Sequence, residues 1–187
     1  MRKTISLLLS ALLLLGLLAG CGKDAGNGNN QGALPDTGGV EDAASPLEGK
    51  SLSAIVDLIY QEKDVGLQVS TEGVDLSNAE SLQYYTGLTD AGKIQEAVVS
   101  ESLIGSQAYS LVLVRVKEQG DAEAVAQDMK SGVNPAKWIC VQADDMKVAG
   151  KGDVVLLIMV ESALADAVTA DQIVNAFSAV AGGLDFQ

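Results

Sequence analysis

The most constraining feature of this 187-residue sequence is an unbroken apolar run from Val154 to Val160. A short apolar run bounded by turn residues is typical of a strand that is buried on both faces. The turn residues are Gly150-Lys151-Gly152-Asp153, which come directly before the run. We therefore predict that residues 154–160 form the most central strand of a sheet.

Three other segments are candidates for strands of the same sheet. Tyr109 to Lys117 is rich in β-branched residues, which predicts a strand, and residues 138–148 are expected to pair with the central strand across the glycine-rich turn. Residues 94–104 fit either a strand or a helix, and both possibilities stay open at this point. Gly105-Ser106-Gln107, which follows that segment, is typical of a hairpin turn.

Four segments space their apolar residues as the buried face of a helix does: residues 51–62, 75–85, 121–131 and 169–182. Ser51 is a candidate N-cap for the first helix, and Asn78 is a candidate for the weaker second helix. Thr169-Ala170-Asp171-Gln172 has the form of a capping box, which predicts the start of the last helix. Gly132 is the glycine expected just after the third helix.

The order strand, turn, strand, helix occurs twice, in residues 94–131 and in residues 138–182. Two such ββα units predict an α+β domain with a four-stranded, mainly antiparallel sheet and helices on one face, preceded by one or two N-terminal helices. The second unit is longer around residues 163–166, and this loop is a candidate site by position alone. Because the two halves share few identical residues, two unrelated hairpin-and-helix units explain the pattern equally well.

The N-terminal stretch has the composition of a secretory signal. A positively charged start precedes an apolar run from Ile5 to Leu18, and small residues lead into Cys21. The run is too short for a transmembrane helix, which needs about 20 apolar residues. Leu18-Ala19-Gly20-Cys21 resembles the lipobox of bacterial lipoproteins. The resemblance implies that residues 1–20 are removed and that Cys21 carries a lipid anchor on the extracytoplasmic face of the cell membrane. The alternative is an ordinary secretory signal with a chance cysteine.

Residues 21–49 are predicted to comprise the lipidated cysteine and a flexible linker. The linker is rich in glycine, asparagine, aspartate and alanine, a composition that cannot bury enough apolar surface to fold. Leu34-Pro35-Asp36-Thr37-Gly38 within it resembles the pentapeptide that sortases cut, but its place near the N-terminus leads us to interpret it as a coincidence. Residues 50–187 are long enough for one acidic domain with its own core.

The charge balance of the chain is strongly acidic. It has 12 Lys and Arg residues against 25 Asp and Glu residues, a net charge of −13. Nucleic-acid binding depends on basic clusters that neutralise phosphates, and adhesion to anionic lipid headgroups needs polybasic segments. We therefore expect no nucleic-acid partner. The expected membrane contact is the lipid anchor, and the expected partner is a protein of the cell envelope.

The absence of histidine removes several classes of active site. With no histidine in the sequence, Ser-His-Asp and Cys-His nucleophilic sites and the usual histidine-containing zinc sites are excluded. If Cys21 carries the lipid, Cys140 is left without a partner for a disulfide or for a four-cysteine zinc site. We predict a protein without catalytic activity, without a cofactor and without a metal site.

Asp144-Asp145 is the only adjacent acidic pair in residues 50–187. It is a candidate cation site, or the carboxylate pair of a hydrolase, which needs two carboxyl groups about 5–9.5 Å apart. In so acidic a domain such a pair also arises by chance, as charge that keeps the protein soluble.

Four further candidates are a thiol and three aromatic rings. Trp138 and Cys140 take alternate positions on the strand predicted at 138–148 and therefore share one face. Cys140 is a candidate reactive thiol, although packing of both side chains in the core is the commoner arrangement. Tyr84 and Tyr85 are candidates for stacking on a sugar or a peptide, whereas capping the edge of the core is the commoner arrangement for such a pair.

Two segments, Asn134–Val141 and Gly152–Met159, are similar to an uncharacterised family of small lipoproteins from Firmicutes. The similarity covers about residues 51–181. It implies a domain of unknown function at a Gram-positive cell surface. No catalytic residue is assigned in that family, so none is transferred to this chain.

Three functions are compatible with these patterns. The first is a membrane-anchored, non-catalytic binding or accessory domain. The second is a hydrolase or glycan-binding protein of the cell wall, which requires a cleft with two facing carboxylates and at least one raised pKa. The third is a binder of a small ligand or cation associated with a transporter, which requires a pocket of about 300 Å³.

Overall fold

The computed structural model describes residues 45–187 of the chain. The predicted signal segment, Cys21 and most of the predicted linker lie outside the described residues. Within residues 45–187, none of the helices combines the length and the apolar character that a membrane crossing needs.

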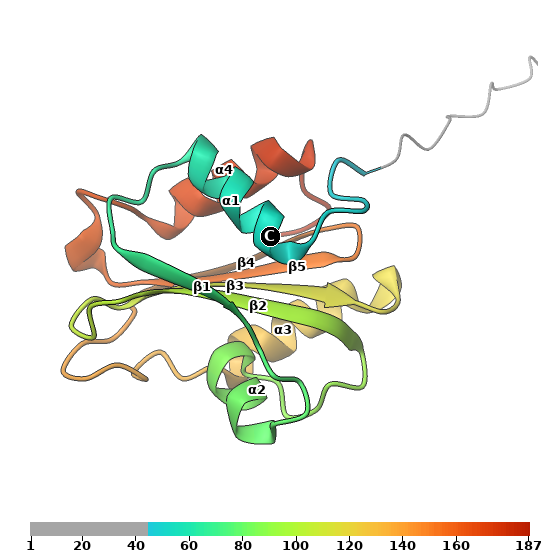
Figure 1. Ribbon diagram of the computed structural model, residues 1–187, viewed down its shortest axis with the longest axis horizontal. Helices are drawn as coiled ribbons and strands as arrows, with labels where there is room; N and C mark the ends of the chain where they lie inside the picture. The colour runs from blue at the N-terminus through green and yellow to red at the C-terminus, as the bar shows by residue number, and fades with distance from the viewer. Residues whose placement is uncertain (1–44) are drawn as a thin grey trace, which may run out of the picture. The chain divides into compact units, whose positions relative to one another are not determined.

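Five strands form one antiparallel sheet. They are β1 (Val69–Gly73), β2 (Ile94–Ser102), β3 (Tyr109–Val116), β4 (Asp145–Lys151) and β5 (Val154–Val160). Their order across the sheet is β1-β2-β3-β5-β4 (Figure 1). β5 is buried along its whole length and pairs with both β3 and β4, as a strand in the interior of the sheet does. The prediction that it is the most central strand is wrong, because the additional strand β1 moves β3 to the middle position.

β1 is an addition to the predicted four-stranded sheet. It pairs with β2 along five residues, from Val69 opposite Ser102 to Gly73 opposite Val98. All but its first residue are exposed, so it lacks the apolar alternation that marks a strand in a sequence. β2 decides the open question about residues 94–104: residues 94–102 form a strand, and residues 103–104 begin the turn to β3.

β4 corrects the strand predicted at residues 138–148. It begins only at Asp145, and residues 133–144 form a loop. The loop turns early, where Asn134 Oδ1 accepts the N–H of Ala136, and Pro135 O accepts the N–H of Ala143. Trp138 and Cys140 therefore do not share a strand face.

Helices cover both faces of the sheet, which corrects the prediction of helices on one face. α1 (Leu52–Glu62) and α4 (Ala170–Ala181) pack on one face, and α2 (Ala79–Thr86) and α3 (Ala122–Gly132) pack on the other (Figure 1). The inner strands β3 and β5 are buried at nearly every position. Because alternate side chains point to opposite faces, both faces need a cover.

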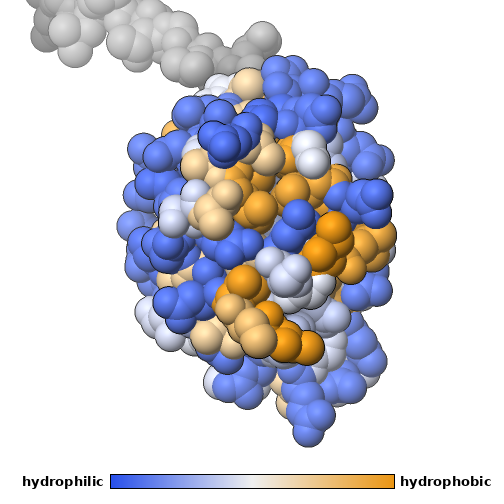
Figure 2. Space-filling model, turned by 90° about the vertical axis from the view of Figure 1, so that its left-hand side faces the viewer, coloured by the Kyte–Doolittle hydropathy of each residue, from blue (hydrophilic) through white to orange (hydrophobic). Residues whose placement is uncertain are grey.

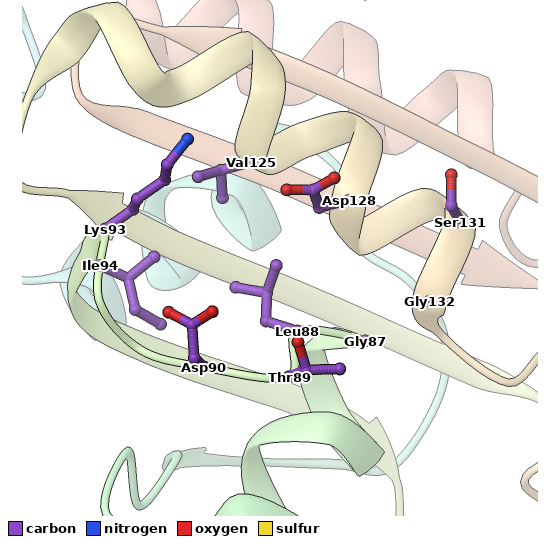
Figure 3. Close-up of a pocket in the computed structure, with 10 residues that line it drawn as sticks. All are labelled: Gly87, Leu88, Thr89, Asp90, Lys93, Ile94, Val125, Asp128, Ser131 and Gly132. Atoms are coloured by element: carbon purple, nitrogen blue, oxygen red, sulfur yellow. The ribbon is translucent and has the colours of Figure 1, made fainter.

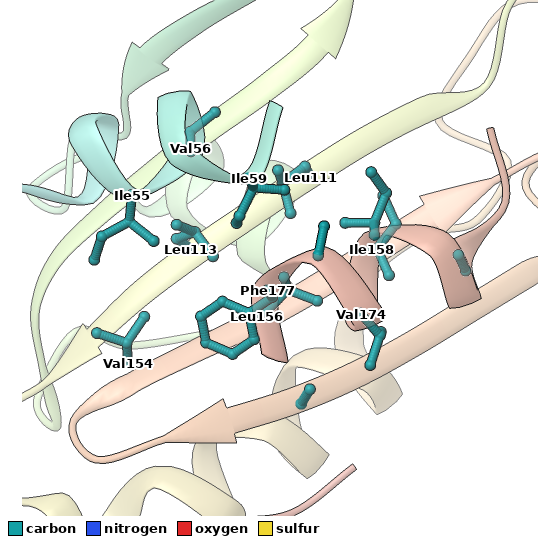
Figure 4. Close-up of a cluster of buried hydrophobic side chains, with 14 of the residues drawn as sticks. Ile55, Val56, Ile59, Leu111, Leu113, Val154, Leu156, Ile158, Val174 and Phe177 are labelled. Carbon is teal, nitrogen blue, oxygen red and sulfur yellow. The ribbon is translucent and has the colours of Figure 1, made fainter. Parts of the chain in front are cut away.

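Two hydrophobic cores result from this arrangement. In the core beneath α1 and α4, Phe177 and Ile59 pack in one cluster with Leu111 and Leu156 of the sheet (Figure 4). Burying side chains of this size contributes about 1.5–3 kcal/mol each. The core beneath α2 and α3 is built from the intervening strand residues and the apolar stripe of α3: Val112, Val114, Val155, Leu157, Val125 and Met129.

The predicted helix starts at Ser51, Asn78 and Thr169 are confirmed. Each side chain accepts a backbone N–H of the first turn of its helix, and Thr169 forms the complete capping box with Gln172. Two short 3-10 helices were not predicted, η1 (Gln119–Asp121) and η2 (Ser162–Leu164).

The two ββα units follow each other as predicted, β2-β3-α3 and then β4-β5-α4. Their helices nevertheless lie on opposite faces of the sheet. When the strands before the two helices are aligned as Leu111–Val116 with Val155–Val160, Leu111 matches Val155. Leu111 belongs to the core beneath α1 and α4, however, and Val155 to the core beneath α2 and α3. The two units therefore share the order of their strands and helices, but their helices do not pack on the same face of the sheet.

Candidate functional site

Three aromatic rings surround the ammonium group of Lys137. Its Nζ lies 4.9 Å from the ring centre of Tyr84, 5.4 Å from that of Tyr85 and 5.3 Å from that of Trp138. The two tyrosine rings meet edge to face. These distances are within the range of cation–π attraction. Two separate parts of the chain, Tyr84-Tyr85 and Trp138, are thus brought together around Lys137, which was not a candidate.

A carboxylate completes this cage. Glu101 Oε1 lies 2.5 Å from Lys137 Nζ, and the ammonium also donates to the Ser110 hydroxyl at 3.3 Å. Only 1% of the Lys137 side chain is exposed. Burial lowers the pKa of Lys137, and the neighbouring Glu101 opposes that shift. We call Tyr84, Tyr85, Trp138 and Glu101 the cage; its cation is the chain's own lysine.

The cage holds the 133–144 loop against α2 and β2. Ile139 follows Trp138 of the cage in the sequence and is 79% exposed. Cys140 follows with a backbone φ of 66°, a left-handed conformation, and its thiol is free and exposed. The expectation that Cys140 packs in the core is therefore wrong. Trp138 is half-buried and packs at the edge of the core beneath α2 and α3.

Four large hydrophobic side chains are exposed on segments that adjoin the cage in the sequence, each within three residues of a cage residue. Among the described residues they are Ile139 at 79%, Leu103 at 65%, Tyr84 at 46% and Ile104 at 43% exposure. Leu103 and Ile104 lie on the β2–β3 turn, two or three residues beyond the cage carboxylate of Glu101. We call these four residues the apolar end. Figure 2 views the molecule from this side and shows hydrophobic groups separated by hydrophilic ones.

The charges around the apolar end are mainly acidic. Glu72, which accepts a hydrogen bond from the Tyr85 hydroxyl of the cage, is exposed, and so is Asp144 at the end of the 133–144 loop. The ammonium of Lys63 donates to two backbone carbonyls, and that of Lys137 is buried in the cage. The electrostatic potential at the exposed surface of this end is therefore negative.

The Asp144-Asp145 pair has a structural position. Asp144 accepts the backbone N–H of Ser162 at 2.6 Å and its hydroxyl at 2.7 Å, and Asp145 accepts the N–H of Ala170 at 3.2 Å. The two carboxylates thus cap the starts of η2 and α4. The bonds from Ser162 lower the pKa of Asp144, whereas a general acid needs a raised pKa. They also fix the candidate loop at 163–166.

A pocket of about 390 Å³ lies between α3 and the loop that joins α2 to β2 (Figure 3). We call it the α2–α3 pocket. Its wall includes Gly87 and Gly132, whose backbones touch: a Cβ atom on Gly132 would lie 2.1 Å from Gly87 O. The volume exceeds the limit of about 300 Å³ set for a small-ligand site.

In the part of the chain from residue 45 onward, no three metal-ligating side chains come together. Comparison of the sequence and the fold with protein families, curated proteins and solved structures finds no match. The similarity to the Firmicutes lipoproteins therefore stays a prediction.

Proposed function

We propose that this protein is a lipid-anchored lipoprotein on the extracytoplasmic face of a cell membrane. Its domain acts as a non-catalytic binding or accessory module for a protein partner of the envelope. The lipobox at Leu18–Cys21 supports the anchor. The observation that carries the binding function is the apolar end.

The apolar end exposes one aromatic and three large aliphatic side chains. Tyrosine is enriched among the few residues that carry most of the binding energy of protein interfaces, and Tyr84 is the candidate for that role here. Exposed apolar groups that gather in one place mark interaction sites more often than isolated ones do. The cage holds Ile139 and Tyr84 in place before binding, which lowers the entropy lost when a partner orders them.

The charge of the domain defines the partner. Residues 45–187 contain nine Lys and Arg residues against 21 Asp and Glu residues. Two basic side chains near the apolar end are engaged internally, so complementarity requires basic residues on the partner. We propose a protein segment that carries Lys or Arg beside an apolar side chain.

Catalysis by the acidic pair receives no support from the geometry. Asp144 and Asp145 bind backbone N–H groups instead of facing each other across a cleft. The second candidate function, a binder of a small ligand or cation associated with a transporter, is favoured by the α2–α3 pocket.

The anchor is tested by Cys21→Ser. We expect the variant to lose incorporation of labelled fatty acid and to leave the membrane fraction. Cys140→Ser is the matched control and should remain lipidated. Retention of the label in Cys21→Ser would overturn the lipobox assignment.

The binding function is tested by capture from native envelopes with the full lipidated chain as bait. We expect one discrete protein to be retained, and Leu103→Asp or Ile139→Asp to reduce its recovery at least tenfold. Gln119→Asp changes an exposed residue on η1, which follows the other end of β3, and is the charge-matched control. Equal loss in all three variants would show that added charge, and not the apolar end, is responsible.

A further inference from the structure

The α2–α3 pocket is held open by the backbone. Gly87 has a φ of 77°, and a Cβ atom placed on it would lie 2.4 Å from Val133 N. With Gly132 pressed against Gly87 O, the loop that joins α2 to β2 is locked against the end of α3. The pocket is therefore formed before any ligand arrives, as most small-molecule sites are.

The floor of the pocket is apolar. Leu88, Ile94 and Val125 line it, and all three are buried members of the core beneath α2 and α3. Its volume of about 390 Å³ equals that of about 13 water molecules, at about 30 Å³ each. A ligand of up to about a dozen heavy atoms therefore fits. Its apolar part would displace water from the floor, where the side chains offer that water no hydrogen bond.

The rim of the pocket is negative. Asp90 and Asp128 both line it (Figure 3). Among the described residues the Asp128 carboxylate makes no hydrogen bond or ion pair, and the Asp90 carboxylate accepts only the N–H of Gly92 through Oδ1. Lys93 is the basic residue of the rim, and its ammonium pairs with Asp121 at 3.0 Å. The pKa of Lys93 is raised mainly by Asp121 and to a smaller extent by Asp128 and Asp90, so this one ammonium partly offsets the two rim carboxylates.

The C-terminal end of α3 adds to the negative electrostatic potential of the rim. Ser131 and Gly132, the last residues of the helix, form part of the wall. The last carbonyls of a helix lack intrahelical partners and carry the negative end of its dipole, which favours a cation. The two carboxylates, the C-terminal end of α3 and the apolar floor all border the same pocket.

From this combination we infer that the α2–α3 pocket binds a small organic amine, with its ammonium at Asp90 and Asp128 and its apolar body on the floor. An anion would meet two carboxylates and a helix C-terminus. A bare metal ion would gain nothing from the apolar floor. This inference is independent of the partner proposed for the apolar end.

The test uses three probes of nearly equal size: butylamine, 1-butanol and butanoate. Each is titrated into the isotope-labelled full chain in detergent, and the amide signals are followed by NMR. We expect butylamine to shift the signals of Leu88, Ile94 and Val125 with saturation. 1-Butanol should bind at least tenfold more weakly, and butanoate should cause no saturable shift.

Two isosteric variants locate the ammonium. Asp128→Asn should weaken butylamine binding at least threefold. Asp57→Asn, an exposed change on α1 across the sheet, should leave it unchanged. Equal binding of amine and alcohol, shifts spread over the acidic surface without saturation, or equal effects of the two variants would overturn the inference.

Discussion

Lys137 Nζ lies 2.5 Å from Glu101 Oε1, inside a ring of three aromatic side chains. The contact joins the 133–144 loop to β2 and sets the position of Ile139. It also shields a cation from solvent in a domain with few basic residues. The cage therefore links the stability of the loop to the shape of the proposed binding surface.

Glu101→Gln should destabilise the domain by about 2 kcal/mol. Breaking a fully buried pair costs about 3–5 kcal/mol, because the remaining charge is uncompensated, and the 22% exposure of the Glu101 side chain reduces that cost. Urea unfolding measures the change. A second variant, Glu101→Gln with Lys137→Met, should recover part of the loss because no charge is left unpaired.

Glu96→Gln is the control on the same strand. Glu96 is 4.0 Å from Arg115 and 43% of its side chain is exposed, so its removal should cost less than about 1 kcal/mol. Equal destabilisation by Glu96→Gln and Glu101→Gln would contradict the account of the cage.

Gly132→Ala should destabilise the domain by about 1–3 kcal/mol, the usual cost of inserting an atom into a packed site. The new Cβ would lie 2.1 Å from Gly87 O, and a backbone carbonyl cannot swing away as a flexible side chain can. Thermal unfolding measures the loss. Gly120→Ala, where a Cβ meets no atom within 4 Å, should be close to neutral. A neutral Gly132→Ala would mean that α3 and the α2–β2 loop are not in contact.

Asp144 makes stability depend on pH in the acid range. The Ser162 hydroxyl and N–H lower the pKa of Asp144 in the folded state. The stabilising contribution is therefore present above the unfolded value of about 3.9 and is lost as the pH falls through the lower folded value. Ser162→Ala should raise the pKa of Asp144, as measured by carboxyl NMR, whereas Ser106→Ala on the β2–β3 turn should not. An unchanged pKa in Ser162→Ala would refute the capping contact.

Local signals in the sequence predict the helices and the inner strands well. The apolar run of β5 and the caps at Ser51, Asn78 and Thr169 depend on neighbours within a few residues, so the sequence alone carries them. β1 depends on pairing with β2, and only Val69 among its residues is even partly buried. Nothing in its own composition distinguishes it from a loop.

The candidate site, like β1, depends on contacts between distant segments that local sequence signals do not reveal. Trp138-Ile139-Cys140-Val141 has the composition of a strand, but its position is set by Lys137, whose partners come from α2, β2 and β3. A lysine buried among aromatic rings has no signature in a single sequence. The arrangement of Tyr84, Tyr85 and Trp138 around Lys137 could therefore not be predicted, although each of these three aromatic residues was a candidate by itself.

The central claim is that the apolar end contacts a protein with basic residues in the native envelope. The most direct measurement places a photo-activatable side chain at position 139 of the full chain and irradiates intact cells. We predict one discrete crosslinked protein, the same adduct from position 103 and none from position 119, with a yield that falls as ionic strength rises. Adducts of equal pattern and yield at positions 139 and 119, or adducts with lipid alone, would contradict it.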